Sequence, residues 1–414
     1  MAIIDGAAVE ALGDERLDWR FKAVPGAAHG LTVREYVAGR PGLDEFGTPL
    51  LTLDAGALDH NVRAMAGWAR AAGVDLAPHG KTTMAPALWR RQLDAGAWGI
   101  TLANLPQVRV ARAFGVQRVL LANELLDPVG LAWLAGQLDA DPEFEFLAWV
   151  DSVRGVELMD AALRAAGARR PVAVCVELGA SPGRTGVRDD AGALRIAEAV
   201  RAAPTLALAG VGGYEGALAH DASAAGLAAV DAYLRRVADL HRRLDYEVAE
   251  PVVTAGGSAF FDQVVEVLAG LDGRVVLRSG AYVVHDDGFY RGISPFARGG
   301  GEPLRSAMHA WARVISRPEP HLALLDAGRR DLSFDAGLPE PQLVRGEGPI
   351  AGARVTALND QHAFMEGGEV EVGQVVRLGL SHPCTALDKW TMIPVVDGAD
   401  RADPVVVDLV RTWF

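Results

Sequence analysis

Residues 75–102 read DLAPHGKTTMAPALWRRQLDAGAWGITL, and this stretch holds a strand, a helix and a second strand in sequence. The runs 75–80 and 98–102 are short and largely apolar, as buried strands are. Between them, over 84–95, apolar residues recur at helical spacing and Arg or Asp occupy the other positions. Gly96 follows, and glycine commonly ends a helix. The stretch therefore predicts one β-α-β unit.

The same alternation continues through the middle of the chain. We expect strands at 75–80, 98–102, 118–122, 145–150, 172–177, 207–213, 251–255 and 275–279. The segments between them predict helices at 84–95, 105–114, 127–139, 153–166, 189–203, 222–244 and 258–271. Eight such strands favour an α/β fold of the (β/α)8, or TIM-barrel, type. A doubly wound open sheet is the alternative, but no G-x-G-x-x-G follows the first strand.

The two ends of the chain lie outside this alternation. After residue 290, Gly and Pro become frequent, and short β-type runs replace helices at 308–316, 321–326, 353–358, 369–378 and 404–410. We therefore divide the chain into an N-terminal segment (1–48), a barrel (49–290) and a mostly β C-terminal domain (291–414). We expect the N-terminal segment to pack against the β domain.

Composition excludes several classes of protein. The chain has 414 residues and a mass of 43.7 kDa, with 50% apolar and 22% charged residues. These proportions exclude a disordered, collagen-like or coiled-coil chain. The net charge of −13 makes nucleic acid an unfavourable partner, because binding phosphates requires a basic face.

Cysteine content and the N-terminal sequence bear on the compartment. Two cysteines, Cys175 and Cys384, are too few for a disulfide framework and favour a reducing cytoplasm. The first residues, MAIIDGAAVEALGDERLDWR, carry acidic side chains where a signal peptide carries basic ones. No run approaches the roughly 18 apolar residues of a membrane span. We expect a cytoplasmic protein, most often an enzyme at this size, with neither nucleic acid nor membrane as partner.

Barrel enzymes place their chemistry at the carboxyl ends of the strands. The first strand is followed by Lys81, and a lysine directly after an apolar strand indicates a partly buried amine with a lowered pKa. A lysine at the rim that only forms a salt bridge is the alternative. The seventh strand is followed by Gly256-Gly257-Ser258, a turn that leads directly into a helix. Such a turn offers free N–H groups to a phosphate, although it would equally serve as a helix cap.

The C-terminal part contains Ser381-His382-Pro383-Cys384-Thr385-Ala386-Leu387-Asp388-Lys389-Trp390. In an extended segment, His382 and Cys384 would point in the same direction. Imidazole and thiolate together form a good pair of zinc ligands. Two ligands are too few for a closed structural site, so a metal held here would keep positions open for substrate or water. A capping histidine beside a buried thiol is the alternative.

Taken together, P-H-G-K-T-T, G-G-S and H-P-C-T-x-x-D-K-W resemble the D-serine dehydratase and D-threonine aldolase family, over roughly residues 45 to 395. These are fold-type III pyridoxal 5′-phosphate enzymes with an alanine-racemase-like barrel and a C-terminal β domain. One departure concerns the first motif. The family often reads P-H-x-K-T-H-K, and Thr83-Met84 replace the last His-Lys here, which is similar to sequences described as amino-acid deaminases.

The resemblance implies a role for each matching residue. Lys81 matches the lysine that binds the cofactor covalently, and His362 matches a histidine in an acidic segment, which we expect to be catalytic. His382 and Cys384 match the metal ligands, and His-x-Cys is similar to the dehydratase branch, whereas the aldolase branch tends to carry His-x-Asp. The residues expected to bind the cofactor are Lys81, His79, Arg184 (ring hydroxyl), Tyr214 (pyridine nitrogen), Gly256, Gly257, Ser258, Gly280 and Tyr282.

The implied function is a dehydratase, or deaminase, of a D-3-hydroxy amino acid of the D-serine, D-threonine or 3-hydroxyaspartate type. The substrate would yield a 2-oxo acid and ammonia. Lys81 would take the Cα proton, and a divalent metal would polarise the hydroxyl at Cβ. Zinc is favoured for that metal, with manganese as the alternative. Relatives in this fold type are commonly dimers, so we expect a homodimer.

Other functions remain open at this stage. Aldol cleavage would give glycine and an aldehyde from the same substrates, and an amino-acid racemase would need a second base and no metal. A non-catalytic pyridoxal-phosphate carrier is usually a lone barrel. A metal-dependent hydrolase on a barrel would need a ligand cluster at the first strand end, where we find none. The substituent on Cβ is not identified by the sequence.

Overall fold

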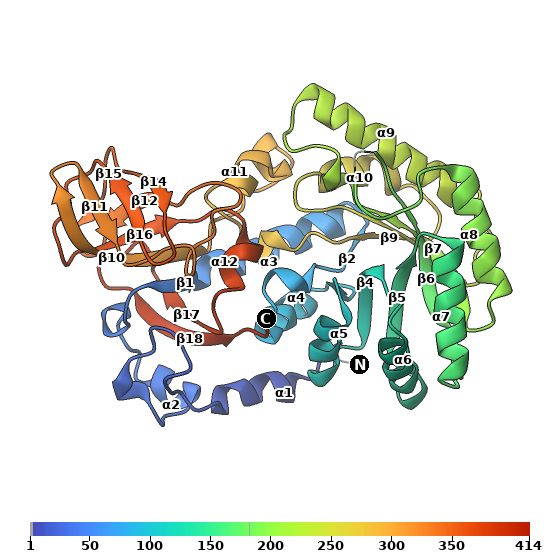
Figure 1. Cartoon of the computed structure of the whole chain (residues 1–414), viewed down its shortest axis with the longest axis horizontal. Coiled ribbons are helices and arrows are strands. Elements are labelled where there is room, and N and C mark those ends of the chain that lie inside the picture. The colour runs from blue at the N-terminus through green and yellow to red at the C-terminus, as the bar shows by residue number, and fades with distance from the viewer. Residues whose placement is uncertain (1–2, 182) are drawn as a thin grey trace. The chain divides into compact units, whose positions relative to one another are not determined.

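The computed structural model describes residues 3–181 and 183–414 of the chain, which divide into two compact units (Figure 1). The first unit comprises residues 3–5, 66–81 and 92–280. The second comprises residues 6–65, 82–91 and 281–414. Two helices, α3 (Ala55–Ala71) and α4 (Pro86–Asp94), pass from one set of residues to the other.

The first unit is built on a sheet of eight parallel strands. They are β2 (Asp75–Leu76), β3 (Ile100–Leu102), β4 (Arg118–Glu124), β5 (Glu145–Val150), β6 (Val172–Leu178), β7 (Leu206–Gly213), β8 (Val252–Ala255) and β9 (Arg274–Leu277). Their order is β2-β9-β8-β7-β6-β5-β4-β3. A parallel bridge between His79 and Thr101 joins the chain beyond β2 to β3 and closes the sheet. The predicted eight-stranded barrel is thus confirmed.

Helices connect consecutive strands of the barrel, as the sequence pattern predicts. They are α5 (Leu105–Ala113), α6 (Pro128–Ala140), α7 (Val153–Ala165), α8 (Asp190–Ala202), α9 (Ala224–His241) and α10 (Phe261–Leu268). Five of them begin with a capping side chain that accepts a hydrogen bond from the backbone N–H three residues further on: Asn104, Asp127, Ser152, Asp189 and Ser223. Each such cap stabilises its helix by about 1 kcal/mol and fixes the residue at which the helix begins.

The barrel interior is a packed core. Its central cluster comprises Ala77, Leu120, Leu147, Trp149, Cys175, Ala209, Val252 and Val276. Alternate residues of parallel strands point inward, so residues from six strands meet there. Burial raises the pKa of the Cys175 thiol, which therefore stays protonated.

The second unit contains the mostly antiparallel β domain. Its strands are β1 (Leu50–Asp54), β10 (Met308–Glu319), β11 (Leu322–Leu325), β12 (Glu340–Val344), β13 (Gly348–Pro349), β14 (Arg354–Leu358), β15 (Ala363–Glu366), β16 (Val375–Gly379), β17 (Met392–Asp397) and β18 (Val405–Arg411). The main path runs β13-β12-β16-β10-β1-β17-β18, and β11, β15 and β14 continue from β10. β1 pairs antiparallel with β10 and parallel with β17, so the first strand of the chain is central in this sheet.

Four short α-helices complete the second unit: α1 (Gly6–Glu10), α2 (Val33–Ala38), α11 (Phe289–Ile293) and α12 (Pro383–Leu387). A capping box between Thr32 and Glu35 starts α2. Side chains of the N-terminal segment, such as Leu17, share one hydrophobic core with Trp311 and Val406 of the sheet. The strand predicted over 369–378 forms only from Val375, because the chain turns at Gly373, where φ is +99°.

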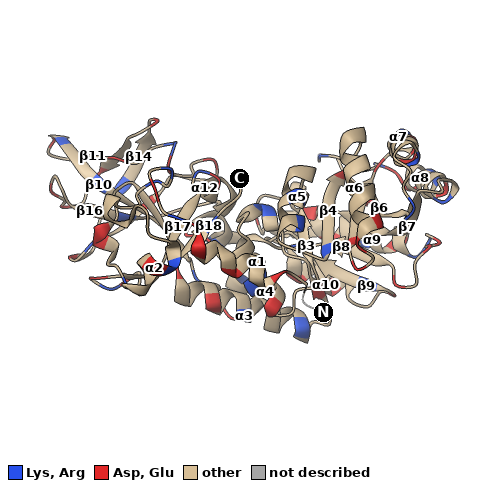
Figure 2. Cartoon of the chain, turned by 90° about the horizontal axis from the view of Figure 1, so that it is seen from below, with Lys and Arg blue, Asp and Glu red and all other residues tan. Residues whose placement is uncertain are grey.

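Basic and acidic residues are interspersed along the chain of each unit, as the blue and red segments of the ribbon show (Figure 2). Many of them form ion pairs on the surface, such as Arg118 with Glu145 at 2.6 Å and Arg243 with Asp190 at 2.8 Å. Among the helices of residues 3–181 and 183–414, none combines the length and the apolar character that a membrane crossing requires.

Candidate functional site

Lys81 lies just beyond a firmly held strand end of the first unit. The chain after β2 is bonded on both sides. Ala77 N–H donates to Leu277 O at 2.8 Å, and Thr101 N–H donates to Pro78 O at 3.0 Å. These bonds fix the backbone up to His79, and a short 3-10 turn then begins at Gly80. Lys81 is therefore a half-buried amine carried on a rigid support.

The chain contains only three lysines, Lys22, Lys81 and Lys389. Lys22 pairs with Asp331 at 3.0 Å and lies over the Trp390 ring, and Lys389 pairs with Asp388 at 3.1 Å. Both belong to the second unit. Lys81 is thus the lysine that the barrel offers for a covalent bond to a carbonyl.

His79 carries a neutral imidazole beside this lysine. Burial, followed by the positive charges of Lys81, Arg278 and Arg184, lowers the pKa of His79 well below its usual range. Its Nδ1 is buried and has no hydrogen-bond partner among the described residues. Three cations and one neutral ring therefore gather at the C-terminal strand ends, with a ring nitrogen left open to a ligand.

Gly280 brings the end of β9 against the end of β2. A Cβ atom added at Gly280 would lie 2.6 Å from the carbonyl oxygen of His79 and 2.8 Å from its Cβ. Any side chain at this position would push the two strand ends apart. The glycine is required for this close approach.

The predicted phosphate turn has an unexpected partner. Gly256 has φ +92°, and the N–H groups of Gly256 and Gly257 donate to the Glu215 carboxylate at 3.0 and 2.6 Å. Glu215 is fully buried, and Ser279 Oγ donates to the carbonyls of both glycines. The turn is therefore rigid, but its first two amides already bind an anion of the protein itself. A phosphate here would displace Glu215 or use donors further along, such as Ser258.

A buried arginine occupies the barrel between these elements. Arg278 donates to Thr254 Oγ1 at 2.7 Å and to Gly213 O at 2.6 Å, and its guanidinium carbon lies 4.8 Å from the Trp149 ring centroid. Burial lowers the pKa of Arg278 from its ordinary value. The indole Nε1 of Trp149 is buried without a partner among the described residues.

Tyr214 follows β7, and Arg184 lies in the loop after β6. The Arg184 guanidinium carbon stacks 4.5 Å from the Tyr214 ring centroid, a cation–π arrangement. Thr185, the next residue, donates to Glu177 Oε1 at 3.1 Å. The structure therefore brings Arg184 and Tyr214 into contact at neighbouring strand ends.

Three carboxylates, Glu124, Asp151 and Glu177, converge at the ends of β4, β5 and β6. One oxygen from each lies within 4.8 Å of the others, the one such group of three potential ligands in the described part of the chain. Burial, then the hydrogen bond to Glu177 and its charge, raise the pKa of Glu124 to about 8. Burial also raises the pKa of Glu177. The pair therefore shares a proton at neutral pH.

These observations bear on whether the barrel fits pyridoxal phosphate. Buried atoms without partners among the described residues lie at one end of the barrel: His79 Nδ1, Trp149 Nε1, Glu124 Oε1 and Glu177 Oε2. A flat polar group would satisfy such atoms, and Lys81 supplies the amine. The residues present thus fit the ring of the cofactor. On the phosphate side, Glu215 already accepts the N–H groups of Gly256 and Gly257.

In the second unit, Asp335 orients His382. Asp335 Oδ2 lies 2.5 Å from His382 Nδ1, and Thr385 Oγ1 donates to Asp335 Oδ1 at 2.6 Å. Because the carboxylate contacts Nδ1, Nε2 is the ring nitrogen that could bind a metal. Metal-binding histidines usually have such a carboxylate hydrogen-bonded to their other ring nitrogen. Cys384 Sγ lies 3.4 Å from Thr82 Oγ1, and Thr82 is the residue after Lys81 in the sequence.

The pair His382 and Cys384 is a coupled proton-binding site. The hydrogen bond to Cys384, together with the charges of Cys384 and Asp335, raises the pKa of His382 to about 9. Because a metal binds neutral imidazole and thiolate, it would displace the protons of this pair. Both side chains are half-buried, so an ion here could reach solvent or a substrate.

The local backbone differs from the extended segment that we expected. His382 has φ +57°, and Cys384 lies in the first turn of α12, which begins at Pro383. Proline favours the first position of a helix, so the chain turns there instead of extending. Asp286 holds this strained backbone, because its Oδ2 accepts the His382 N–H at 2.8 Å. The two side chains meet across the turn, not along a strand.

Two further predicted residues, Tyr282 and His362, lie in the second unit. Tyr282 is buried in the 3-10 turn Ala281–Val283 of the second unit. His362 is exposed in the turn between β14 and β15, where its carbonyl accepts the Asn359 N–H. No side-chain contact of its ring with His382 or Cys384 is present among the described residues. The roles of both residues stay predictions.

Sequence reasoning missed several of these residues. Glu124, Asp151 and Arg278 lie at the strand ends that the barrel rule singles out, so a systematic reading of each end would have found them. Asp286 and Asp335 lie in loops and act through hydrogen bonds to His382. No spacing rule links them to the H-P-C motif.

The chain is similar in sequence to known proteins over most of its length. The family model described as a putative serine dehydratase domain matches residues 307–396. A D-threonine aldolase from Arthrobacter sp is 32% identical over 343 residues, which cover 81% of this chain and 85% of that protein.

Solved structures share the fold over nearly the whole chain. D-threonine aldolase from Filomicrobium marinum has a TM-score of 0.76 and 27% identity, covering 90% of this chain and 96% of its own. D-threo-3-hydroxyaspartate dehydratase from Delftia sp. HT23 has a TM-score of 0.69 and 22% identity, covering 89% and 97%. A cysteine-to-alanine mutant of a D-threo-3-hydroxyaspartate dehydratase was solved in a metal-free form. By sequence and fold, this chain belongs to the D-threonine aldolase and D-serine dehydratase family of fold-type III pyridoxal-phosphate enzymes.

Proposed function

We propose that this enzyme is a pyridoxal-phosphate-dependent, metal-assisted dehydratase of a D-3-hydroxy amino acid that releases a 2-oxo acid and ammonia. The observation that carries the proposal is the His382 imidazole, oriented by Asp335 beside the Cys384 thiol. This arrangement suits a metal ion with open positions, and such an ion is what a hydroxide leaving group needs.

The cofactor, when bound, supplies an electron sink for the charge that develops at the substrate Cα. Lys81 would hold the cofactor, and its amine would accept the Cα proton of the substrate. The neutral His79 and the cationic Arg278 are hydrogen-bond donors of the same barrel end. Tyr214, with Arg184 stacked on it, offers a phenol for the cofactor ring.

A divalent ion on His382 Nε2 and Cys384 Sγ would supply a Lewis acid for the Cβ hydroxyl. Zinc is the favoured ion, because thiolate prefers a borderline-soft cation to magnesium or calcium, and manganese is the alternative. When the ion displaces the Nε2 proton, Asp335 would accept the hydrogen bond of the proton that remains on Nδ1. The proton lost from Cα and the hydroxide lost from Cβ together make one water. The enamine that remains becomes an imine and takes up one water, which gives a 2-oxo acid and ammonia.

Aldol cleavage is the second candidate, and the sequence relatives favour it. The relative at 32% identity is an aldolase, and a 3-hydroxy-D-aspartate aldolase of Paracoccus denitrificans is 28% identical over 372 residues. This reaction breaks the Cα–Cβ bond and needs a base at the Cβ hydroxyl. The Cys384 thiolate, as opposed to a carboxylate at that position, is our reason to rank dehydration first.

Product analysis separates the two reactions. We would incubate the holoenzyme with D-serine, D-threonine and D-3-hydroxyaspartate, each with zinc or manganese, and measure oxo acid, ammonia, glycine and aldehyde together. Oxo acid and ammonia in equal amounts support dehydration. Glycine and aldehyde in equal amounts would replace it by the aldolase, and inversion at Cα without either product would indicate a racemase. The L-enantiomers are the control for substrate configuration.

We also propose a homodimer in the cytoplasm. Light scattering coupled to gel filtration would measure the mass directly. A monomer at micromolar concentration, with full activity, would contradict this part of the proposal.

A further inference from the structure

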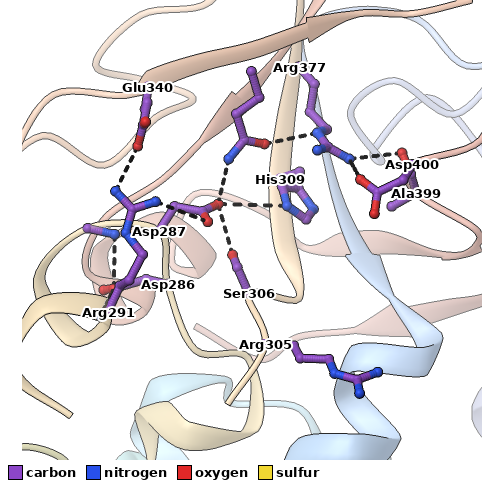
Figure 3. Close-up of polar contacts among 12 residues, drawn as sticks. Asp286, Asp287, Arg291, Arg305, Ser306, His309, Glu340, Arg377, Ala399 and Asp400 are labelled. Carbon is purple, nitrogen blue, oxygen red and sulfur yellow. Dashed lines mark hydrogen bonds and ion pairs between the residues drawn. The ribbon is translucent and has the colours of Figure 1, made fainter. Parts of the chain in front are cut away.

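The second unit contains a polar cavity of about 350 Å³ that none of the assignments above uses. It lies where β1 passes into α3, next to the start of β10 and to β16 (Figure 3). Ligand pockets in proteins begin at about 300 Å³, so this space can hold a small molecule. The lining residues are Asp54, Gly56, Ala57, Asp287, Arg305, Ser306, His309, Gln342, Arg377, Ala399 and Asp400.

The acidic side chains of this cavity are held in fixed positions. Asp287 Oδ2 accepts hydrogen bonds from Ser306 Oγ at 2.9 Å and from Gln342 Nε2 at 3.0 Å (Figure 3). Asp400 pairs with Arg377 at 2.5 Å, and Arg377 in turn donates to Gln342 Oε1 at 2.9 Å. The network therefore fixes Asp287 and connects it through Gln342 and Arg377 to Asp400, whose side chain is exposed.

Two polar groups among the lining residues lack partners in the described part of the chain. The guanidinium of Arg305 has neither an ion pair nor a hydrogen bond with any residue that the structure describes, and it stands apart in Figure 3. His309 is 7% exposed, and its Nδ1 is buried without a partner among the described residues. Its Nε2 lies 3.7 Å from Asp287 Oδ2, on the other side of the ring. A buried nitrogen of this kind is unfavourable unless a polar group bonds to it.

The charges around the cavity nearly cancel. Arg305 and Arg377 are cationic, whereas Asp54, Asp287 and Asp400 are anionic. His309 contributes no charge at neutral pH, because burial and then Arg377 lower its pKa to about 4. The first turn of the 17-residue helix α3, at Gly56 and Ala57, adds the positive end of a helix dipole. A multiply charged anion or cation would meet repulsion here, whereas a molecule with one charge of each sign would not.

We propose that this cavity binds a small α-amino acid as its zwitterion. The carboxylate of the ligand pairs with Arg305, and its ammonium group pairs with the carboxylates of Asp287 and Asp400, beside the His309 ring. This site is additional to the barrel chemistry proposed above and does not depend on it. An enzyme that acts on amino acids would then also carry a separate place at which one binds.

Calorimetric titration of the holoenzyme with glycine tests the proposal. We expect glycine to bind at this cavity, and Arg305→Gln or Asp400→Asn to weaken that binding about tenfold or more, the loss expected for one charge-assisted pair. Arg63→Gln is the matched control, because Arg63 is an exposed arginine of the same unit outside the cavity. Binding at the barrel is followed separately through the visible absorbance of the cofactor, which neither variant should alter.

Acetate, methylamine and inorganic phosphate serve as comparison ligands. Acetate and methylamine each carry one of the two charges, so each should bind more weakly than glycine. The proposal fails if phosphate or acetate binds as tightly as glycine, or if Arg305→Gln binds glycine like the wild type. The ring signals of His309, assigned with His309→Gln, should shift with glycine in the unmodified protein. An unmoved His309 signal at saturating glycine would also overturn the proposal.

Discussion

The carboxylate of Asp335 lies 2.5 Å from Nδ1 of His382, 47 residues away in the sequence, and this contact decides which ring nitrogen a metal can use. The thiol of Cys384 and the hydroxyl of Thr385 complete the same small group. In the proposed metal site, Asp335 would hold the His382 ring in the orientation that a metal ligand needs.

Asp335→Asn should lower zinc affinity by about 10- to 100-fold, since the amide no longer fixes the tautomer or raises the basicity of His382. A chromophoric chelator in competition measures the affinity. Asp18→Asn is the control, because Asp18 pairs with Arg20 on the surface of the same unit. Equal affinities of wild type and Asp335→Asn would mean that His382 is not a ligand.

A chelator should abolish turnover while the fold and the cofactor absorbance persist, because the proposed ion acts on the substrate hydroxyl and the barrel core does not involve it. Cys384→Ala should have the same effect. Cys384→Asp restores a harder ligand and should shift the metal preference toward manganese. Full activity of the enzyme in the presence of the chelator would mean that His382 and Cys384 do not bind a catalytic metal.

The two cysteines should differ sharply toward iodoacetamide. Cys384 is partly exposed, whereas Cys175 is fully buried and burial raises the pKa of its thiol. Peptide mass spectrometry should find the label on Cys384 alone, and zinc should protect it. Rapid labelling of Cys175 in folded protein would contradict the packed barrel core.

Borohydride reduction of the holoenzyme should leave the cofactor on the peptide that contains Lys81. Lys81→Ala should abolish the visible band and the turnover. Lys22→Ala and Lys389→Ala are the matched controls, and both should keep the band, because both lysines lie in ion pairs of the second unit. A persistent band in Lys81→Ala would assign the covalent bond elsewhere.

Glu124 should make stability depend on pH. Its pKa is about 8 in the folded protein against an ordinary value of 4.5, so the folded state binds this proton more tightly. That stabilisation is complete below about pH 4.5 and is lost as the pH rises through 8. Glu124→Gln should therefore melt a few degrees above wild type at pH 9. Glu143→Gln, at an exposed position, should follow the wild-type curve.

The sequence predicted the barrel because each strand-helix repeat carries its own local pattern. It did not predict β12 or β17, since Pro341 and Pro394 lie within them and proline argues against a strand. Lys81 could be predicted as a candidate residue because it directly follows a predicted strand. Glu215 could not be recognised as the partner of Gly256 and Gly257, because the contact joins the loops after two neighbouring strands, β7 and β8, which are about 40 residues apart in the sequence.

The central position of β1 in the second sheet has a consequence for synthesis. β1 ends at Asp54, but its partners begin at Met308 and Met392, so about 250 residues separate the strand from the first of them. At about 5–20 residues per second, a ribosome needs roughly 10 to 50 seconds to supply that partner. The barrel strands emerge within this interval and can fold first. During this interval the apolar strand β1 is unpaired on the nascent chain. An unpaired apolar strand is prone to aggregate, so we expect a chaperone to bind it.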